Sequence, residues 1–76
     1  MAQHHPAVAS LLRYFDPTHL PPPLREISEP FSVLAHQLAD RGDLDGPELT
    51  VALRKLLESK DAAVRAALPT TNGGQS

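Results

Sequence analysis

The periodicity of apolar residues in segment 49–68 most constrains the fold of this chain. At about 100° per residue, one helix face would collect Leu49, Leu53, Leu56, Ala63, Val64 and Ala67. The segment therefore predicts an amphipathic helix that packs against a partner. Lys60 falls in the middle of the same face. Because a buried ammonium group needs a partner, Lys60 implies an acidic neighbour, an anionic ligand or a side chain that reaches along the apolar surface to water.

A short helix is predicted at the start of the chain, from about Pro6 to Phe15. Its apolar residues follow the i, i+3, i+4, i+7 spacing and are Val8, Leu11, Leu12 and Phe15. Asp16 precedes Pro17, and a residue before proline is disfavoured in the helical region, so the helix ends there. Segment 18–23 contains three consecutive prolines, and we expect an extended, polyproline-like surface structure in it.

A second long helix is predicted from about Leu24 to Arg41. Its apolar face would consist of Leu24, Ile27, Phe31, Leu34, Ala35 and Leu38. Pro30 removes a backbone donor inside this segment. Either one kinked helix runs through Pro30, as the continuous apolar face favours, or the helix begins at Ser28 as N-cap. Val33 points away from the apolar face and suggests a second contact surface.

The segment from Gly42 to Gly46 predicts a turn between the two long helices. Gly42 is a natural C-cap, and Pro47 suits the first position of the next helix. Two long helices joined by a short turn form an antiparallel hairpin. The predicted fold class is therefore all-α: a short N-terminal helix followed by an antiparallel two-helix hairpin.

Chain length suggests that this hairpin associates with other copies. The chain has 76 residues, of which we assign 1–5 to a flexible N-terminus, 6–68 to one domain and 69–76 to a disordered tail. A domain of about 60 residues buries only about 60% of its unfolded surface. Without cysteine there is no disulfide to compensate, so a homo-oligomer is expected. No signal peptide or membrane-spanning apolar run is visible, and we expect a cytoplasmic protein.

Charge and motifs argue against several functions. The net charge is −2 and the basic residues are scattered, which does not suit a protein that binds duplex DNA. The histidines lack metal-ligand spacing on one helix face; they are His4, His5, His19 and His36. A nucleophile motif, a phosphate loop and a dinucleotide fingerprint are all missing from the sequence. We therefore expect no enzymatic activity, metal or cofactor.

Cations of the last predicted helix are candidates for binding an anion. They are Arg54, Lys55, Lys60 and Arg65. The alternative is a solvated helix face in which Arg54 pairs with Glu58, and Arg65 with Asp61, at the i, i+4 spacing. For Lys60 the alternative is an ion pair with a carboxylate across an oligomer interface.

An aromatic residue beside a cation at the end of the first helix is a further candidate. Tyr14 follows Arg13 and lies off the apolar face. Such an aromatic ring could stack on a nucleobase while the guanidinium contacts its phosphate. Phe15, in contrast, is expected in the core.

Two segments of the chain resemble the small helical-hairpin cyclic-nucleotide sponges of bacteriophages, which counter CBASS and Thoeris immunity by sequestering the host's signalling nucleotide. In the first segment the similarity rests on Leu20, Pro21, Leu24, Ile27, Phe31, Leu34 and Ala35. The second segment is 46–66, with an Ala-Leu-x-Lys-Leu core formed by Ala52, Leu53, Lys55 and Leu56. The similarity covers about residues 11–68.

This resemblance implies a hexamer, built as a trimer of dimers, in the host bacterial cytoplasm. It also implies that pockets between protomers bind cyclic di- or trinucleotides without hydrolysing them. The ligand-binding residues would be Tyr14, Arg25, Arg54, Lys60 and Arg65.

The chain departs from the family pattern at two places. Where the family has a tyrosine two residues after its aromatic residue, this chain has Pro17. A basic residue early in the family's second helix aligns with Ser28, and Arg25 is the nearest cation. The alternative function is therefore a helical-hairpin protein-interaction module without a nucleotide ligand.

Overall fold

The computed structural model describes residues 4–68, which contain three helices and no strand. They are α1 (Pro6–Arg13), α2 (Pro22–Asp40) and α3 (Gly46–Ala67). The all-α prediction is confirmed for this part of the chain. Residues 1–3 and 69–76 lie outside the described residues, and the predicted disordered tail falls there.

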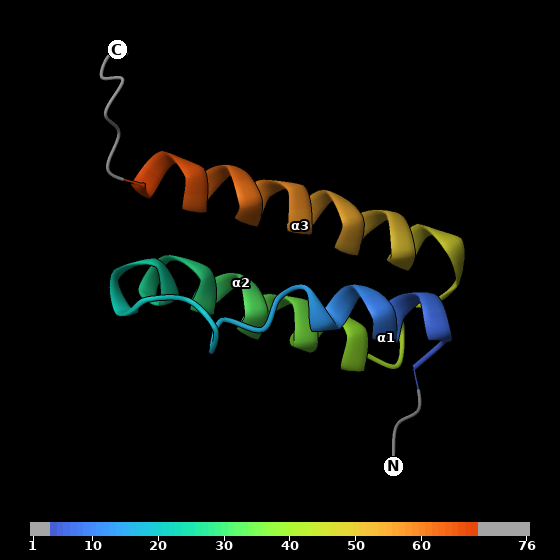
Figure 1. Ribbon diagram of the computed structural model, residues 1–76. Helices are drawn as coiled ribbons and strands as arrows, with labels where there is room; N and C mark the ends of the chain where they lie inside the picture. The colour runs from blue at the N-terminus through green and yellow to red at the C-terminus, as the bar shows by residue number, and fades with distance from the viewer. Residues whose placement is uncertain (1–3, 69–76) are drawn as a thin grey trace.

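The two long helices lie side by side and run in opposite directions (Figure 1). α1 lies beside them near the end where α2 passes into α3, and it contacts both. One side of each helix is thereby buried, while the rest of each surface faces solvent.

α1 is shorter than predicted, because it ends at Arg13 and a tight turn follows. In that turn the N–H of Phe15 donates to the Leu12 carbonyl at 3.0 Å. Asp16 Oδ1 then accepts from the Thr18 N–H at 3.0 Å and from its hydroxyl at 2.8 Å. Both hydrogen bonds lower the pKa of Asp16, and the one from the Thr18 backbone N–H has the larger effect. The turn carries Phe15 into the core, where it is fully buried.

The predicted extended structure of segment 18–23 is wrong at its end. Pro22 and Pro23 form the start of α2, and Pro21 is the N-cap with extended backbone angles. The first N–H groups of a helix have no partner within the helix, so proline loses nothing there, and its fixed φ suits the helix.

α2 is continuous through Pro30, as the single-helix interpretation predicted. Pro30 is exposed, and so is Glu26, whose carbonyl would otherwise have accepted from residue 30. The oxygen without a helix donor therefore lies on the side that faces water. Ser28 is no N-cap, because it lies inside α2 and is fully buried.

The turn between α2 and α3 also differs from the prediction. The C-cap of α2 is Arg41 in an extended conformation, and the positive φ of 79° is found at Gly46 instead of Gly42. Arg41 forms two hydrogen bonds to Asp43, from Nε at 2.8 Å and from Nη2 at 2.7 Å. This pair raises the pKa of Arg41 and lowers that of Asp43. Gly46 then allows the left-handed step that starts α3 before Pro47.

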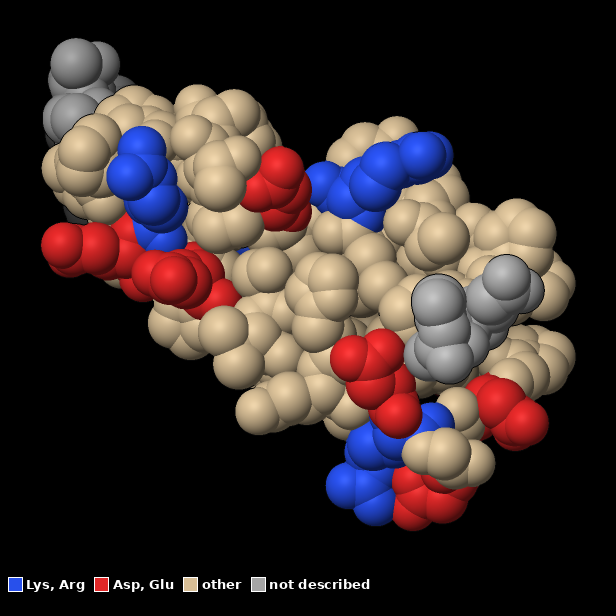
Figure 2. All heavy atoms as spheres, turned by 90° about the horizontal axis from the view of Figure 1, so that it is seen from below, with Lys and Arg blue, Asp and Glu red and all other residues tan. Residues whose placement is uncertain are grey.

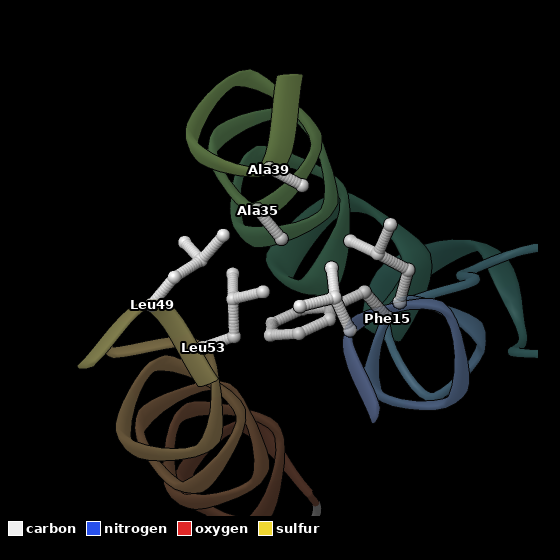
Figure 3. Packing of buried hydrophobic residues seen from close by; sticks show 7 residues of the cluster. Phe15, Ala35, Ala39, Leu49 and Leu53 are labelled. Atoms are coloured by element: carbon white, nitrogen blue, oxygen red, sulfur yellow. The ribbon is translucent and has the colours of Figure 1, made fainter. Parts of the chain in front are cut away.

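The apolar core collects residues from all three helices and from the turn after α1 (Figure 3). Its members are Val8, Leu12, Phe15, Ala35, Ala39, Leu49 and Leu53. The α2 side is made of alanines, which let the larger side chains of α3 and Phe15 approach its backbone. Phe15 and Leu53 are the largest fully buried side chains of the core.

The buried residues of α2 and α3 form matching layers. They are Ser28, Ala35 and Ala39 on α2, and Leu49, Leu53 and Lys60 on α3. Along α2 the gaps between these residues are seven and then four positions, and along α3 they are four and then seven. In antiparallel helices with the same rise per residue, this places Leu49 opposite Ala39 and Leu53 opposite Ala35. Figure 3 shows these side chains lying together. The same register puts Ser28 and Lys60 in one polar layer.

Replacing Ser28 by alanine should stabilise the protein. The Ser28 Oγ is buried and has no hydrogen-bond partner among residues 4–68. Removing an unsatisfied hydroxyl, and gaining the helix propensity of alanine, should raise the free energy of unfolding by about 1 kcal/mol. Urea denaturation at fixed protein concentration measures the change. Ser32→Ala on the same helix is the matched control and should gain about 0.5 kcal/mol or less. A Ser28→Ala variant that is less stable than the unmodified chain would contradict the conclusion that the Ser28 hydroxyl is unsatisfied.

Candidate functional site

Lys60 contacts an acidic neighbour within its own helix. Its side chain is 11% exposed, and Nζ lies 3.0 Å from Oδ1 of Asp61, whose side chain is 48% exposed. Successive residues of a helix normally point in different directions. The long stem of Lys60 nevertheless lets its ammonium group leave the interface and reach the carboxylate at the edge of the helix. Of the three explanations for this lysine, the structure therefore shows an acidic neighbour that is reached by snorkelling.

The ion pairs predicted along the outer side of α3 are not formed. The ion pairs within residues 4–68 are His4–Asp40, Arg41–Asp43 and Lys60–Asp61. Arg54 does not pair with Glu58. Arg65 does not pair with Asp61, because that carboxylate is turned towards Lys60. The guanidinium groups of Arg54 and Arg65 are therefore exposed on α3 without a carboxylate partner in this part of the chain.

An open pocket of about 730 Å³ lies where α1 begins, α2 ends and α3 begins. Its apolar lining comes from Val8, Ala39, Leu44, Leu49 and Val51. Its polar lining includes His4, Asp40, Arg41, Asp45, Thr50 and Arg54. A pocket of this size, with a mostly apolar wall and a few polar groups, is within the range used for small ligands.

Three of the polar groups around this pocket are paired within the chain. His4 Nε2 and Asp40 Oδ1 lie 2.9 Å apart, and Arg41 is engaged with Asp43. Arg54 lines the pocket and makes no ion pair among residues 4–68. It is therefore the cation of this pocket whose N–H donors are all free of a carboxylate in this part of the chain.

The residues predicted to bind a ligand are not all brought together in a single copy of the chain. Tyr14 is 62% exposed and lies outside the core, as predicted. Arg25 is exposed, and its Nη2 donates to the Leu20 carbonyl at 3.0 Å. Arg54 and Arg65 share one side of α3 but are eleven residues apart, which is roughly 16 Å along the axis.

Sequence reasoning missed the contact that closes one side of the pocket. It assigned His4 to a flexible N-terminus, whereas His4 contacts Asp40. His5 is the N-cap of α1, and its Nδ1 accepts from the Ala7 N–H at 3.0 Å. The contact between His4 and Asp40 joins residues 36 positions apart, so no local spacing could have revealed it.

Surface charge is distributed in separate groups. On the face shown in Figure 2, blue and red side chains lie in small clusters on a mostly uncharged surface. This face has no continuous positive stripe of the kind that follows a nucleic-acid backbone.

Residues 4–68 show neither a cluster of metal-ligating side chains nor a membrane-spanning helix. They contain no group of three or more histidine or acidic side chains placed to hold a metal ion. None of their helices is long and apolar enough to cross a membrane.

Comparison with known proteins adds no relative of this chain. No protein-family model matches it, and no curated protein or solved structure is significantly similar to it. The resemblance to phage sponges therefore rests on the residues given above.

Replacing Lys60 by methionine should preserve or increase stability. Methionine fills a similar volume without an ammonium group in the interface, so the free energy of unfolding should rise by up to about 1 kcal/mol. Asp61→Asn should lower it by about 1 kcal/mol, because it weakens the acceptor that the largely buried ammonium group uses.

Thermal and urea unfolding of both variants test this prediction. Glu58→Gln is the matched control, since it removes an exposed carboxylate of α3 that forms no ion pair within residues 4–68. A strongly destabilised Lys60→Met variant would show that the lysine has a favourable contact beyond Asp61.

Proposed function

We propose that this chain is a non-catalytic protein that binds and sequesters cyclic di- or trinucleotides between copies of itself. The observation that carries the proposal is the pair of exposed arginines on one side of α3, Arg54 and Arg65, which lack carboxylate partners within residues 4–68. Arginine binds phosphate oxygens through two parallel hydrogen bonds, so such groups are suited to phosphodiesters.

The spacing of these arginines supports a site between copies. About 16 Å along one helix separates the backbones of the two arginines, so both groups of one copy reach the same small ligand only if their side chains extend towards each other. A symmetric arrangement of two copies repeats every cation and so brings cations from different chains together.

Other exposed groups supply the remaining chemistry of a nucleotide site. Tyr14 offers an accessible aromatic ring on which a purine can stack. The Arg25 guanidinium is already oriented by the Leu20 carbonyl and keeps further N–H donors for a phosphate. Lys60 is committed to Asp61, so it joins the site only if a ligand phosphate replaces that carboxylate.

The biological role we propose follows from the resemblance to the phage sponges. The chain would act in the cytoplasm of an infected bacterium and remove the nucleotide messenger of the immune response. A trimer of dimers would present several such sites. Sequestration requires affinity rather than turnover, so intact nucleotide should be recovered from the complex.

Isothermal titration calorimetry with a panel of cyclic di- and trinucleotides tests the proposal. At least one should bind, while the linear dinucleotide of the same bases should bind more weakly. Arg54→Ala and Arg65→Ala should each weaken binding about tenfold or more, the effect of losing a hydrogen bond to a charged group. Lys55→Ala is the matched control, because it removes the same charge from another side of α3.

Two results would overturn this function. One is the absence of heat with every nucleotide in the panel, from a protein whose helical circular dichroism shows it to be folded. The other is the appearance of hydrolysis products by chromatography, which would make the chain an enzyme. If Lys55→Ala loses as much affinity as the arginine variants, the binding site is not confined to the side of α3 that carries Arg54 and Arg65.

A protein-interaction module is the second candidate, and one observation favours it. Val33 and Leu34 are neighbouring apolar residues of α2 and are 51% and 43% exposed. Exposed apolar groups of this kind are common at contact surfaces, although single ones are ordinary. A folded chain that binds no cyclic nucleotide would favour this candidate over the first.

A further inference from the structure

The outer face of α2 has the composition of a contact surface. We define this face by Glu26, Pro30, Val33, Leu34, Gln37 and Arg41. These residues are all exposed and follow one another at helical spacing, on the side opposite the buried Ser28, Ala35 and Ala39. Its centre is apolar, since Val33 is 51% exposed and Leu34 is 43% exposed.

Charges of opposite sign lie at the two ends of this face. Glu26 is near the start of α2, and Arg41 is its C-cap. A surface with an apolar centre and opposite charges at its ends is complementary to a copy of itself that runs in the opposite direction. In a parallel arrangement each charge would meet its own kind.

We propose that the outer face of α2 pairs with the same face of a second copy of this chain about a two-fold axis. An axis between Val33 and Leu34 brings Val33 of one copy against Leu34 of the other. The same register brings Pro30 against Gln37 and Glu26 against Arg41. Each of these contacts occurs twice, so the pairing contains two ion pairs that flank an apolar centre.

Arg41 is prepared for this contact by its own turn. Its Nε and Nη2 donate to the two carboxylate oxygens of Asp43, which fixes the plane of the guanidinium. A guanidinium has five N–H donors, so donors remain for a second carboxylate. Glu26 is exposed and in no ion pair within residues 4–68, and it supplies that carboxylate in the proposed dimer.

The pairing deepens the proposed function, because it rests on the proposal that copies of this chain associate. It names the surface that would form a dimer, and it leaves the arginines of α3 outside the contact. A contact along one helix is small compared with a standard protein interface, so a reversible dimer is expected unless further contacts reinforce it.

Sedimentation equilibrium over a range of concentrations, without nucleotide, tests the pairing. The unmodified chain should associate, and Leu34→Glu should weaken association at least tenfold, because it places two carboxylates at the apolar centre. Glu29→Arg is the matched control. It changes an exposed carboxylate of the same helix that lies off the outer face, and it should leave association unchanged. Circular dichroism checks that each variant is folded.

A charge exchange tests the register and does not alter the apolar centre. Glu26→Arg alone and Arg41→Glu alone should each weaken association several-fold, since like charges then meet. The double variant Glu26→Arg/Arg41→Glu should recover most of the loss, because opposite charges meet again. A double variant no better than either single one would overturn this pairing. So would a monomeric unmodified chain, or an oligomer that Leu34→Glu leaves intact.

The experiment separates this inference from the proposed function. Association that follows the charge exchange, together with no heat from any cyclic nucleotide, would support the pairing and end the sequestration proposal. Nucleotide binding by an oligomer that Leu34→Glu leaves intact would support sequestration between copies and end this pairing.

Discussion

The packing of Leu53 against Ala35, with Phe15 beside them, is the interaction on which the rest of the structure depends. All three residues are fully buried, and they come from α3, from α2 and from the turn after α1. The other core residues pack around these three, and so small a domain buries only a limited apolar area in total. Alanine on α2 is as important as leucine on α3, because the small side chain lets the two backbones approach and leaves space for the phenyl ring.

The polar layer of Ser28 and Lys60 interrupts this apolar interface. It contains a hydroxyl with no hydrogen-bond partner in the described part of the chain, and an ammonium group held by Asp61. Such a layer adds little stability. It does favour the observed register, because shifting one helix by two turns would place the lysine opposite Ala35, in the middle of the apolar core. The layer also changes the surface, since Asp61 is engaged with Lys60 and leaves Arg65 accessible.

The functional proposals rest on which groups the fold leaves unused. α3 presents arginines on its outer side, and α2 presents an apolar centre between opposite charges. These two surfaces belong to different helices, so association through α2 would leave the arginines of α3 accessible. A binding protein made of such copies gains sites by symmetry, which is how a short chain with few cations can enclose an anionic ligand.

Periodicity and proline placement determined much of this protein from the sequence alone: the three helices, the position of Phe15 in the core and that of Lys60 in the apolar face. They did so because helix formation and amphipathicity depend on neighbours within a few residues. Only the tertiary structure decided that His4 contacts Asp40, that Ser28 is buried and that Asp61 turns to Lys60 rather than Arg65. These outcomes depend on how closely the helices approach and on which side chains compete for the same carboxylate, and sequence spacing does not contain that information.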